Sequence, residues 1–292
     1  MPGGELDPAL ILRSLGVTDA GATTPVSGGY DTAIWRVQRG SSVDALRVFR
    51  PGQGPSVQRE LLAMRTAAAG GIPVPFVRAS SLWQERPVML LSWLPGHTLA
   101  QEVISHPWRL WPLGVQFGRM QAAIHAIPAS GGMGSADWIS LAGPDEAALQ
   151  ERLRDLPPRS ASLLHLDFHP LNVLTDGRRI TAVLDWTNAL PGDPRADAAR
   201  TFAILCMEPM PPRRGALLER YARLLLAQAW RHGYEQVAGA TGDLSLFYAW
   251  AGAMLIRDLW PRAGRPDRGF RPEHFAHTRR WVASNKRRAG VT

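Results

Sequence analysis

The stretch that decides the fold is residues 165–174, which read His165-Leu166-Asp167-Phe168-His169-Pro170-Leu171-Asn172-Val173-Leu174. It places an aspartate and an asparagine five residues apart, in a loop that leads into a short β-like segment. Thirteen residues after Asn172, at the end of the next β-like segment, stands Asp185. The turn residues between the two segments predict a hairpin. We therefore expect Asn172 and Asp185 to meet at the same end of that hairpin.

The side chains of this stretch match the needs of phosphoryl transfer. Asp167 is suited to accept the proton of an attacking hydroxyl, and Asn172 and Asp185 are suited to hold Mg²⁺ against phosphate oxygens. Their oxygen atoms fit a hard cation better than zinc. His165 and His169 lie in a loop rather than on one helix face, so we do not expect a zinc pair. The sequence predicts Asp167 as the base and Asn172 and Asp185 as the metal ligands.

The pattern resembles a known family of enzymes. His-x-Asp-x-x-x-x-Asn followed by a hairpin and an aspartate is typical of kinases. With Leu184-Asp185-Trp186 and 192–197, it is similar to the aminoglycoside phosphotransferase and choline-kinase-like branch, which usually carries glycine at the position of Leu166. The resemblance implies a phosphate donor, ATP or GTP, and a small acceptor with a hydroxyl group, of antibiotic, sugar or amino-alcohol type. It also implies that His165 and Asp197 brace the catalytic loop.

The order of predicted elements agrees with this resemblance. β-like stretches and helices alternate in the order helix, three strands, helix, two strands, over residues 8–15, 23–27, 33–38, 43–49, 56–70, 74–83 and 87–93. After Leu94-Pro95-Gly96 the chain is mainly helical. We expect an α+β, bilobal protein-kinase-like fold. Residues 1–93 would form a small antiparallel-sheet, nucleotide-binding lobe with one main helix, and residues 94–292 a larger helical lobe with the catalytic loop and the acceptor site.

A buried acid and a strand arginine are expected to pair in the N-terminal lobe. Glu60 lies on or beside the apolar face of its helix, where a carboxylate requires a partner. A kinase supplies this partner from the third strand, normally as a lysine that also binds phosphates. This chain has 32 arginines and one lysine, Lys286. We predict that Arg47 takes the lysine's place; the alternative is that Arg47 is a surface arginine on an edge strand.

Two further segments are candidates for nucleotide contacts. Ser27, Gly28 and Gly29 lie between the first two predicted strands, where a loop covers the phosphates, and paired glycines let backbone amides approach phosphate. Ser92 and Leu94 flank the junction of the lobes, where backbone groups would hydrogen-bond the adenine.

Composition narrows the possible partners and compartment. The net charge of +8 comes from arginines spread along all 292 residues, without a nucleic-acid-binding signature, so we expect no nucleic-acid partner. No apolar run approaches the roughly 20 residues of a membrane span. The N-terminus does not resemble a signal peptide, and Cys206 is the only cysteine. These features favour the cytoplasm; they leave the oligomeric state open.

The acceptor and the activity itself allow alternatives. Residues 257–288 carry ten basic residues and three acids, which favours a neutral or anionic acceptor over a polycationic one. Trp186, beside Asp185, is a candidate for the acceptor pocket. The main alternative is a catalytically impaired kinase-fold protein that binds a nucleotide or a partner, because Arg47 and Leu166 both depart from the usual pattern.

Overall fold

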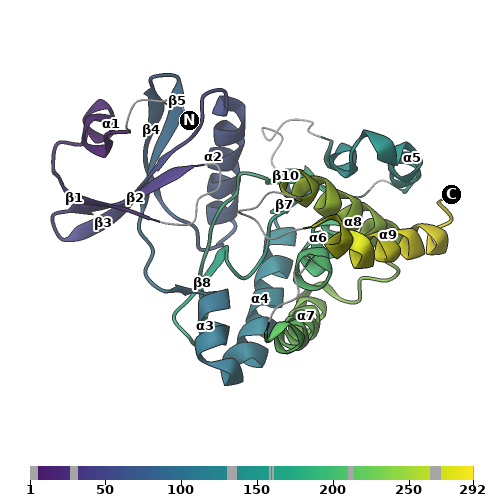
Figure 1. The fold of residues 1–292 in the computed structure, drawn as a ribbon. Coiled ribbons are helices and arrows are strands. Elements are labelled where there is room, and N and C mark those ends of the chain that lie inside the picture. The colour runs from purple at the N-terminus through teal and green to yellow at the C-terminus, as the bar shows by residue number, and fades with distance from the viewer. Residues whose placement is uncertain are drawn as a thin grey trace.

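The structure is a computed structural model that describes residues 6–26, 32–129, 137–157, 159, 161–209, 214–263 and 271–291. A sheet with two helices forms the smaller lobe, and helices dominate the larger one (Figure 1). The predicted α+β, bilobal fold is confirmed.

The smaller lobe is an antiparallel sheet with the strand order β1-β2-β3-β5-β4. Its elements are α1 (Pro8–Ser14), β1 (Ala20–Pro25), β2 (Ala33–Arg39), β3 (Ser42–Val48), α2 (Gly54–Ala69), β4 (Val77–Trp83) and β5 (Arg86–Ser92). β4 starts three residues later than the sequence predicts. Pro75 is one of the three residues that were predicted to belong to this strand but do not, and it has no N–H to donate to a neighbouring strand.

Alternation along β3 and β5 directs side chains to both faces of this sheet. Leu46, Val48 and Leu90 join the cluster that α1 covers. Phe49 and Met89 point the other way, into the cluster that contains the apolar face of α2. Arg47 is two residues before Phe49, so the alternation of side chains along the strand places it on the face of the sheet that α2 covers.

The larger lobe combines short strands with long helices. Its strands are β6 (His97–Thr98), β7 (Ser162–Leu164), β8 (Val173–Thr175), β9 (Ile180–Val183) and β10 (Leu190–Gly192). Its α-helices are α3 (Leu99–Ser105), α4 (Leu110–His125), α5 (Ala147–Arg154), α6 (Pro194–Met207), α7 (Ala216–Ala238), α8 (Ser245–Leu259) and α9 (Ala276–Arg288). The predicted hairpin is β8–β9, which also pairs with β6.

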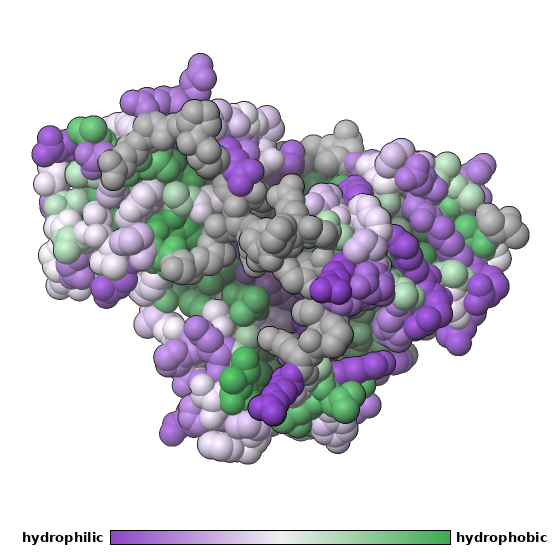
Figure 2. All heavy atoms as spheres, viewed as in Figure 1, coloured by the Kyte–Doolittle hydropathy of each residue, from purple (hydrophilic) through white to green (hydrophobic). Residues whose placement is uncertain are grey.

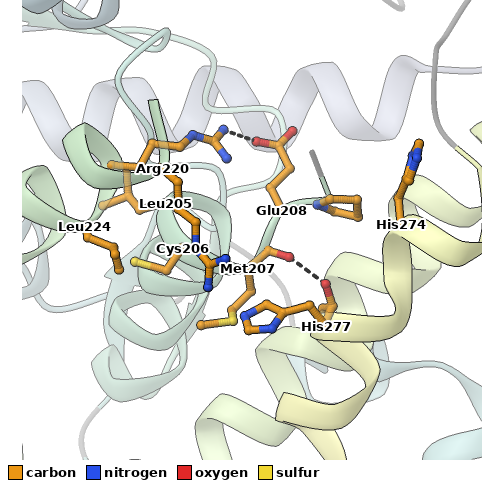
Figure 3. A pocket seen from close by; sticks show the side chains of 11 residues that line it. Leu205, Cys206, Met207, Glu208, Arg220, Leu224, His274 and His277 are labelled. Carbon is orange, nitrogen blue, oxygen red and sulfur yellow. Dashed lines mark hydrogen bonds and ion pairs between the residues drawn. The ribbon is translucent and has the colours of Figure 1, made fainter. Parts of the chain in front are cut away.

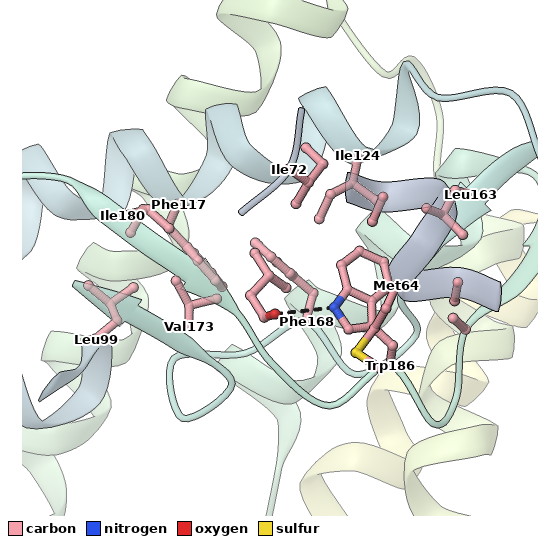
Figure 4. Packing of buried hydrophobic residues seen from close by; sticks show 14 of the residues in the cluster. Met64, Ile72, Leu99, Phe117, Ile124, Leu163, Phe168, Val173, Ile180 and Trp186 are labelled. Carbon is pink, nitrogen blue, oxygen red and sulfur yellow. Dashed lines mark hydrogen bonds between the residues drawn. The ribbon is translucent and has the colours of Figure 1, made fainter. Parts of the chain in front are cut away.

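One hydrophobic cluster continues from α2 into the larger lobe. Figure 4 shows Met64 of α2 beside Trp186, and the same cluster includes Ile124 of α4 and Val173 of the β8–β9 hairpin. Phe168 of the loop after β7 stacks on Phe117 of α4, with ring centroids 4.4 Å apart. Burial of each large apolar side chain contributes about 1.5–3 kcal/mol. The loop that carries Asp167 is therefore anchored in the core at the very next residue.

Close packing of α4 against α7 fixes the scaffold behind this loop. A Cβ atom on Gly118 would lie 1.9 Å from the carbonyl oxygen of Trp230, and one on Gly233 would lie 1.9 Å from that of Val115. Only glycine allows the two backbones to approach so closely. The helices lie side by side in Figure 1.

Exposed apolar side chains gather on one part of the surface. In Figure 2 hydrophobic atoms are visible at the lower edge of the molecule, where Figure 1 places α3, α4 and α7. These helices and the turn between α3 and α4 carry exposed Ile104, Trp108, Trp111, Leu217 and Tyr221.

Across the described residues, no helix has both the length and the hydropathy that a membrane crossing requires.

Candidate active site

Asp167 and Asn172 lie together in the loop between β7 and β8. The Asn172 Nδ2 atom donates to the Asp167 carbonyl oxygen at 3.0 Å and lies 3.3 Å from Asp167 Oδ2. His169 Nε2 lies 3.6 Å from the same carboxylate oxygen. The two candidate residues are thus held in one compact turn.

The Asp167 carboxylate is ionised at neutral pH. Burial opposes its charge, but the nearby His169 and then the positive charge of Arg200 outweigh burial and lower the pKa of Asp167 to about 2. Its side chain is 27% exposed. A charged, partly accessible carboxylate can accept a hydrogen bond from an incoming hydroxyl group.

Asp185 lies beside Asn172 because the β8–β9 hairpin places the two chain segments together. Val173 pairs with Val183, and the Leu184 N–H donates to the Asn172 carbonyl oxygen at 2.8 Å. The Asp185 side chain is 44% exposed. Its backbone has a φ of +58°, which is uncommon for a residue other than glycine. Such strained residues cluster at functional sites.

Buried polar groups brace the loop from below. The carboxylate of Asp197, in the first turn of α6, accepts the N–H groups of His165 and Leu166, each at 2.8 Å. His125 Nε2 of α4 lies 3.0 Å from the same carboxylate, and its Nδ1 lies 2.8 Å from the hydroxyl of Tyr234. Burial would raise the pKa of Asp197, but the hydrogen bond and charge of His125 keep it below its usual value.

His165 acts as a neutral brace rather than a titrating group. Burial lowers its pKa. Its Nε2 lies 3.0 Å from the carbonyl oxygen of Leu184, so Nε2 carries the proton, and its Nδ1 accepts the Asp167 N–H at 3.3 Å. His165 therefore links the Asp167 loop to the segment that carries Asp185.

Leu166, which stands where the family usually has glycine, adopts a backbone conformation that favours glycine. Its φ is +59°, and its side chain is fully buried. The left-handed conformation costs a residue with a Cβ atom about 1–2 kcal/mol. The side chain offsets this cost by packing into the cluster beneath α6 and α8.

The predicted ion pair between Arg47 and Glu60 is present. Arg47 Nη1 lies 2.6 Å from Glu60 Oε1, and Arg47 Nη2 lies 3.7 Å from Asp185 Oδ1. Burial disfavours the Arg47 charge, but Glu60 and Asp185 outweigh it and raise the pKa of the guanidinium. The alternative that Arg47 lies on an edge strand is wrong, because β3 lies between β2 and β5.

The other nucleotide candidates differ in what the structure describes. Ser92 is held by β-type contacts: its N–H donates to the Phe76 carbonyl oxygen and its Oγ accepts the Phe76 N–H, both at 2.8 Å. The Trp93 N–H donates to the carbonyl oxygen of Val43. Leu94 follows them at the junction and is half-buried. The candidate residues Ser27, Gly28 and Gly29 lie outside the described residues.

The expectation for Trp186 is wrong, whereas its neighbour Thr187 has a place in the site. Trp186 is fully buried and donates from Nε1 to the Val183 carbonyl oxygen (Figure 4), so it cannot line an acceptor pocket. The Thr187 hydroxyl lies 2.9 Å from Glu60 Oε2 and 2.8 Å from Asp185 Oδ1. Its position two residues after Asp185 is the one sequence signal that could have indicated it.

A separate cavity of about 140 Å³ lies where the end of α6 meets α7 and α9 (Figure 3). Cys206 and His277 are among the residues that line it. Burial raises the pKa of the Cys206 thiol to about 11, so the thiol is not a nucleophile at neutral pH. Asp197 is ten residues before Met207 on α6, which corresponds to roughly 15 Å of helix. The cavity is therefore separate from the Asp167 loop.

Known proteins resemble this chain in sequence or in fold. A stretch of 55 residues is 46% identical to hygromycin-B 4-O-kinase of Escherichia coli; it covers 18% of this chain and only 16% of that protein. The fold is similar to a thermostable mutant of aminoglycoside phosphotransferase APH(4)-Ia in a ternary complex with AMP-PNP and hygromycin B. That match has a TM-score of 0.68 and 20% identity, over 97% of this chain and 98% of the other.

Spectinomycin phosphotransferase APH(9)-Ia, in complex with ADP and spectinomycin, matches with a TM-score of 0.59 and 13% identity over 100% of both chains. At such identities these structures establish the fold. The model of the phosphotransferase enzyme family matches residues 22–145 and 135–238, a region that contains the whole candidate site. The chain belongs to the phosphotransferase enzyme family.

Proposed function

We propose that this protein transfers the γ-phosphate of ATP or GTP to a hydroxyl group of a small molecule. The observation that carries the proposal is that hydrogen bonds hold Asp167, Asn172 and the segment before Asp185 together. Asn172 is hydrogen-bonded to Asp167, and its own carbonyl oxygen binds the N–H of Leu184, the residue before Asp185. Phosphoryl transfer depends mainly on positioning and charge, and this arrangement supplies both.

Asp167 is proposed to act as the base. With a pKa near 2 it is a weak base, suited to orient the acceptor hydroxyl and to take its proton as the bond to phosphorus forms. The hydrogen bond from Asn172 and the buried brace through Asp197 hold it in position. Loss of Asp167 should therefore reduce turnover far more than nucleotide binding.

Asn172 and Asp185 are proposed to hold Mg²⁺, which would neutralise developing charge on the phosphates. Their chemistry fits this ion. The Asn172 amide directs its NH₂ group to Asp167, which leaves its oxygen as a ligand, and Asp185 keeps an exposed carboxylate. Among the described residues, no cluster of three or more His, Cys, Asp or Glu forms a metal cage. Mg²⁺ commonly binds through one or two side chains together with substrate phosphates.

The nucleotide is proposed to bind between residues 1–93 and residues 94–292. Arg47, held by Glu60, would neutralise its phosphates. Ser27, Gly28 and Gly29 would cover the phosphates, and the backbone at Ser92 and Leu94 would bind the adenine. The N–H groups of Ser92 and Trp93 already bind protein acceptors, which favours the backbone of Leu94 for this role.

The acceptor is proposed to be an antibiotic, a sugar or an amino alcohol, without nucleic acid as a partner. Similarity to hygromycin-B 4-O-kinase over a stretch of 55 residues makes hygromycin B the first compound to test. Neutral and anionic compounds should follow, because residues 257–288 are rich in arginine. The single cysteine is consistent with a reducing compartment such as the cytoplasm.

One observation favours a second candidate function, a catalytically impaired kinase fold that binds nucleotide or a partner. The Arg47 guanidinium lies 3.7 Å from Asp185, so it competes for the carboxylate that a metal ion would use. A lysine at this position would place one compact charge there instead.

The test is release of ADP or GDP with Mg²⁺ across a panel of hydroxyl acceptors. Wild type is compared with Asp167→Ala and with Asp145→Ala, which removes an exposed carboxylate in the same lobe. The proposal expects acceptor-dependent release that Asp145→Ala keeps and Asp167→Ala loses by at least a hundredfold. Mg²⁺-dependent nucleotide binding without turnover for any acceptor would favour the impaired-kinase alternative. The absence of both binding and turnover would refute the two together.

A further inference from the structure

Four side chains from both lobes meet at the candidate metal site. Arg47 of β3 and Glu60 of α2 come from the smaller lobe, and Asp185 and Thr187 follow β9 of the larger one. Glu60 is fully buried and receives Arg47 on one carboxylate oxygen and the Thr187 hydroxyl on the other, at 2.6 and 2.9 Å. The same hydroxyl lies 2.8 Å from Asp185. Thr187 is the uncharged link between the two carboxylates.

The hydroxyl cannot satisfy both carboxylates at once. A threonine hydroxyl has a single hydrogen to donate, and ionised carboxylates only accept. When the hydrogen points to Glu60, the hydroxyl oxygen faces Asp185 with a lone pair, and the reverse holds when it points to Asp185. Both contacts are within hydrogen-bond distance, so the unsatisfied one is unfavourable. A positive charge bound at Asp185 would remove this conflict by leaving the hydrogen to Glu60.

We propose that Thr187 is a positioning residue that couples Mg²⁺ binding at Asp185 to the attachment of α2 through Glu60. This inference rests on the proposed function, because it takes Asp185 as a metal ligand. With the charge of Asp185 offset, the hydroxyl donates fully to Glu60 and strengthens the contact between the lobes. Without the hydroxyl, Asp185 loses its orienting partner, and the polar link from Glu60 to the larger lobe is reduced, among the described residues, to the 3.7 Å contact between Arg47 and Asp185.

The chain offers matched variants for a test. Thr187→Val replaces the hydroxyl with a methyl group of similar size, and Thr187→Ser keeps the hydroxyl but removes the methyl. Thr181→Val makes the same change on β9, at a buried hydroxyl that has no hydrogen-bond partner among the described residues. Circular dichroism establishes that each variant is folded before binding is measured.

The measurement is AMP-PNP affinity by calorimetry with and without Mg²⁺, which requires no turnover. We expect Thr187→Val to reduce the Mg²⁺-dependent gain in affinity about tenfold, the value of one hydrogen bond to a charged group. Binding without Mg²⁺ should be unchanged. Thr187→Ser should stay within about threefold of wild type, because it keeps that hydrogen bond, and Thr181→Val should match wild type. Hydrogen exchange should show that Mg²⁺ with AMP-PNP protects α2 in wild type and Thr187→Ser but not in Thr187→Val.

Two results would overturn the inference alone: an unchanged Mg²⁺ effect in Thr187→Val, or equal losses in Thr187→Val and Thr187→Ser. A wild-type protein that binds AMP-PNP equally well with and without Mg²⁺ would refute the proposed metal role of Asp185, and the inference with it. The wild-type titration therefore separates failure of the proposed function from failure of the Thr187 coupling.

Discussion

Replacing Leu166 with alanine and, separately, with glycine measures the backbone strain next to Asp167. Both changes remove most of a fully buried side chain, so each should destabilise the fold by about 3–5 kcal/mol. The informative quantity is the difference between them. Leu166 has a φ of +59°, where a Cβ atom costs about 1–2 kcal/mol and glycine costs nothing.

Leu164 of β7 supplies the control, because it is also fully buried in the same cluster and has no positive φ. There, glycine should be less stable than alanine by about 1–2 kcal/mol, of which about 0.8 comes from the lost methyl group and the rest from unfolded-chain freedom. At Leu166 the relief of strain should cancel this difference, so the two variants should agree within about 0.5 kcal/mol. Urea unfolding, followed by tryptophan fluorescence, measures both pairs. If the alanine and glycine variants differ in their free energy of unfolding as much at Leu166 as at Leu164, the backbone of Leu166 is not strained.

Three further changes test the scaffold. Gly118→Ala should destabilise by about 2 kcal/mol, opposite to the usual helix preference for alanine, because its Cβ would meet the Trp230 carbonyl oxygen at 1.9 Å; an unchanged melting temperature would contradict the close packing. Asp197→Asn should lose about 2–4 kcal/mol because an amide cannot accept both loop N–H groups and the His125 contact. The Asp197 pKa is depressed in the folded state, so this loss should be full above about pH 4, the unfolded value, and should shrink as pH falls further; a loss as large at pH 3 as at pH 6 in urea titrations would contradict it. Glu60→Ala should cost about 3 kcal/mol because it leaves the Arg47 charge largely buried, and Arg47→Met in the same background should recover part of it in thermal unfolding; no recovery would argue against the pair.

Most of the architecture around the site could be predicted from local patterns. Arg47 was identifiable as the partner of Glu60 because strand alternation and helical spacing each restrict the facing side, and the chain has no lysine in that lobe. Asn172 and Asp185 were identifiable because a hairpin turn separates them, and the observed β8–β9 pairing follows directly from it.

Other parts depend on contacts that local patterns do not contain. Thr187 joins Glu60 across 127 positions of sequence, so its closeness to Asp185 could indicate it, but no periodicity or turn signal could reveal its contact with Glu60. The side chain of Trp186 points into the core, where it packs in one cluster with Met64 and other apolar side chains. The positive φ of Leu166 is set by Asp197, which pulls two successive amides toward one carboxylate. These are tertiary effects that override the local preference of each residue.

The most direct test of the central claim is the fate of the γ-phosphate. The protein is incubated with Mg²⁺, ATP labelled with ¹⁸O in its γ-phosphate, and each acceptor beginning with hygromycin B, and mass spectrometry then detects the label. We predict that the labelled phosphate appears on an acceptor hydroxyl with wild type and Asp145→Ala, and is absent with Asp167→Ala. Labelled inorganic phosphate with every acceptor unmodified, or equal transfer by Asp167→Ala, would contradict it.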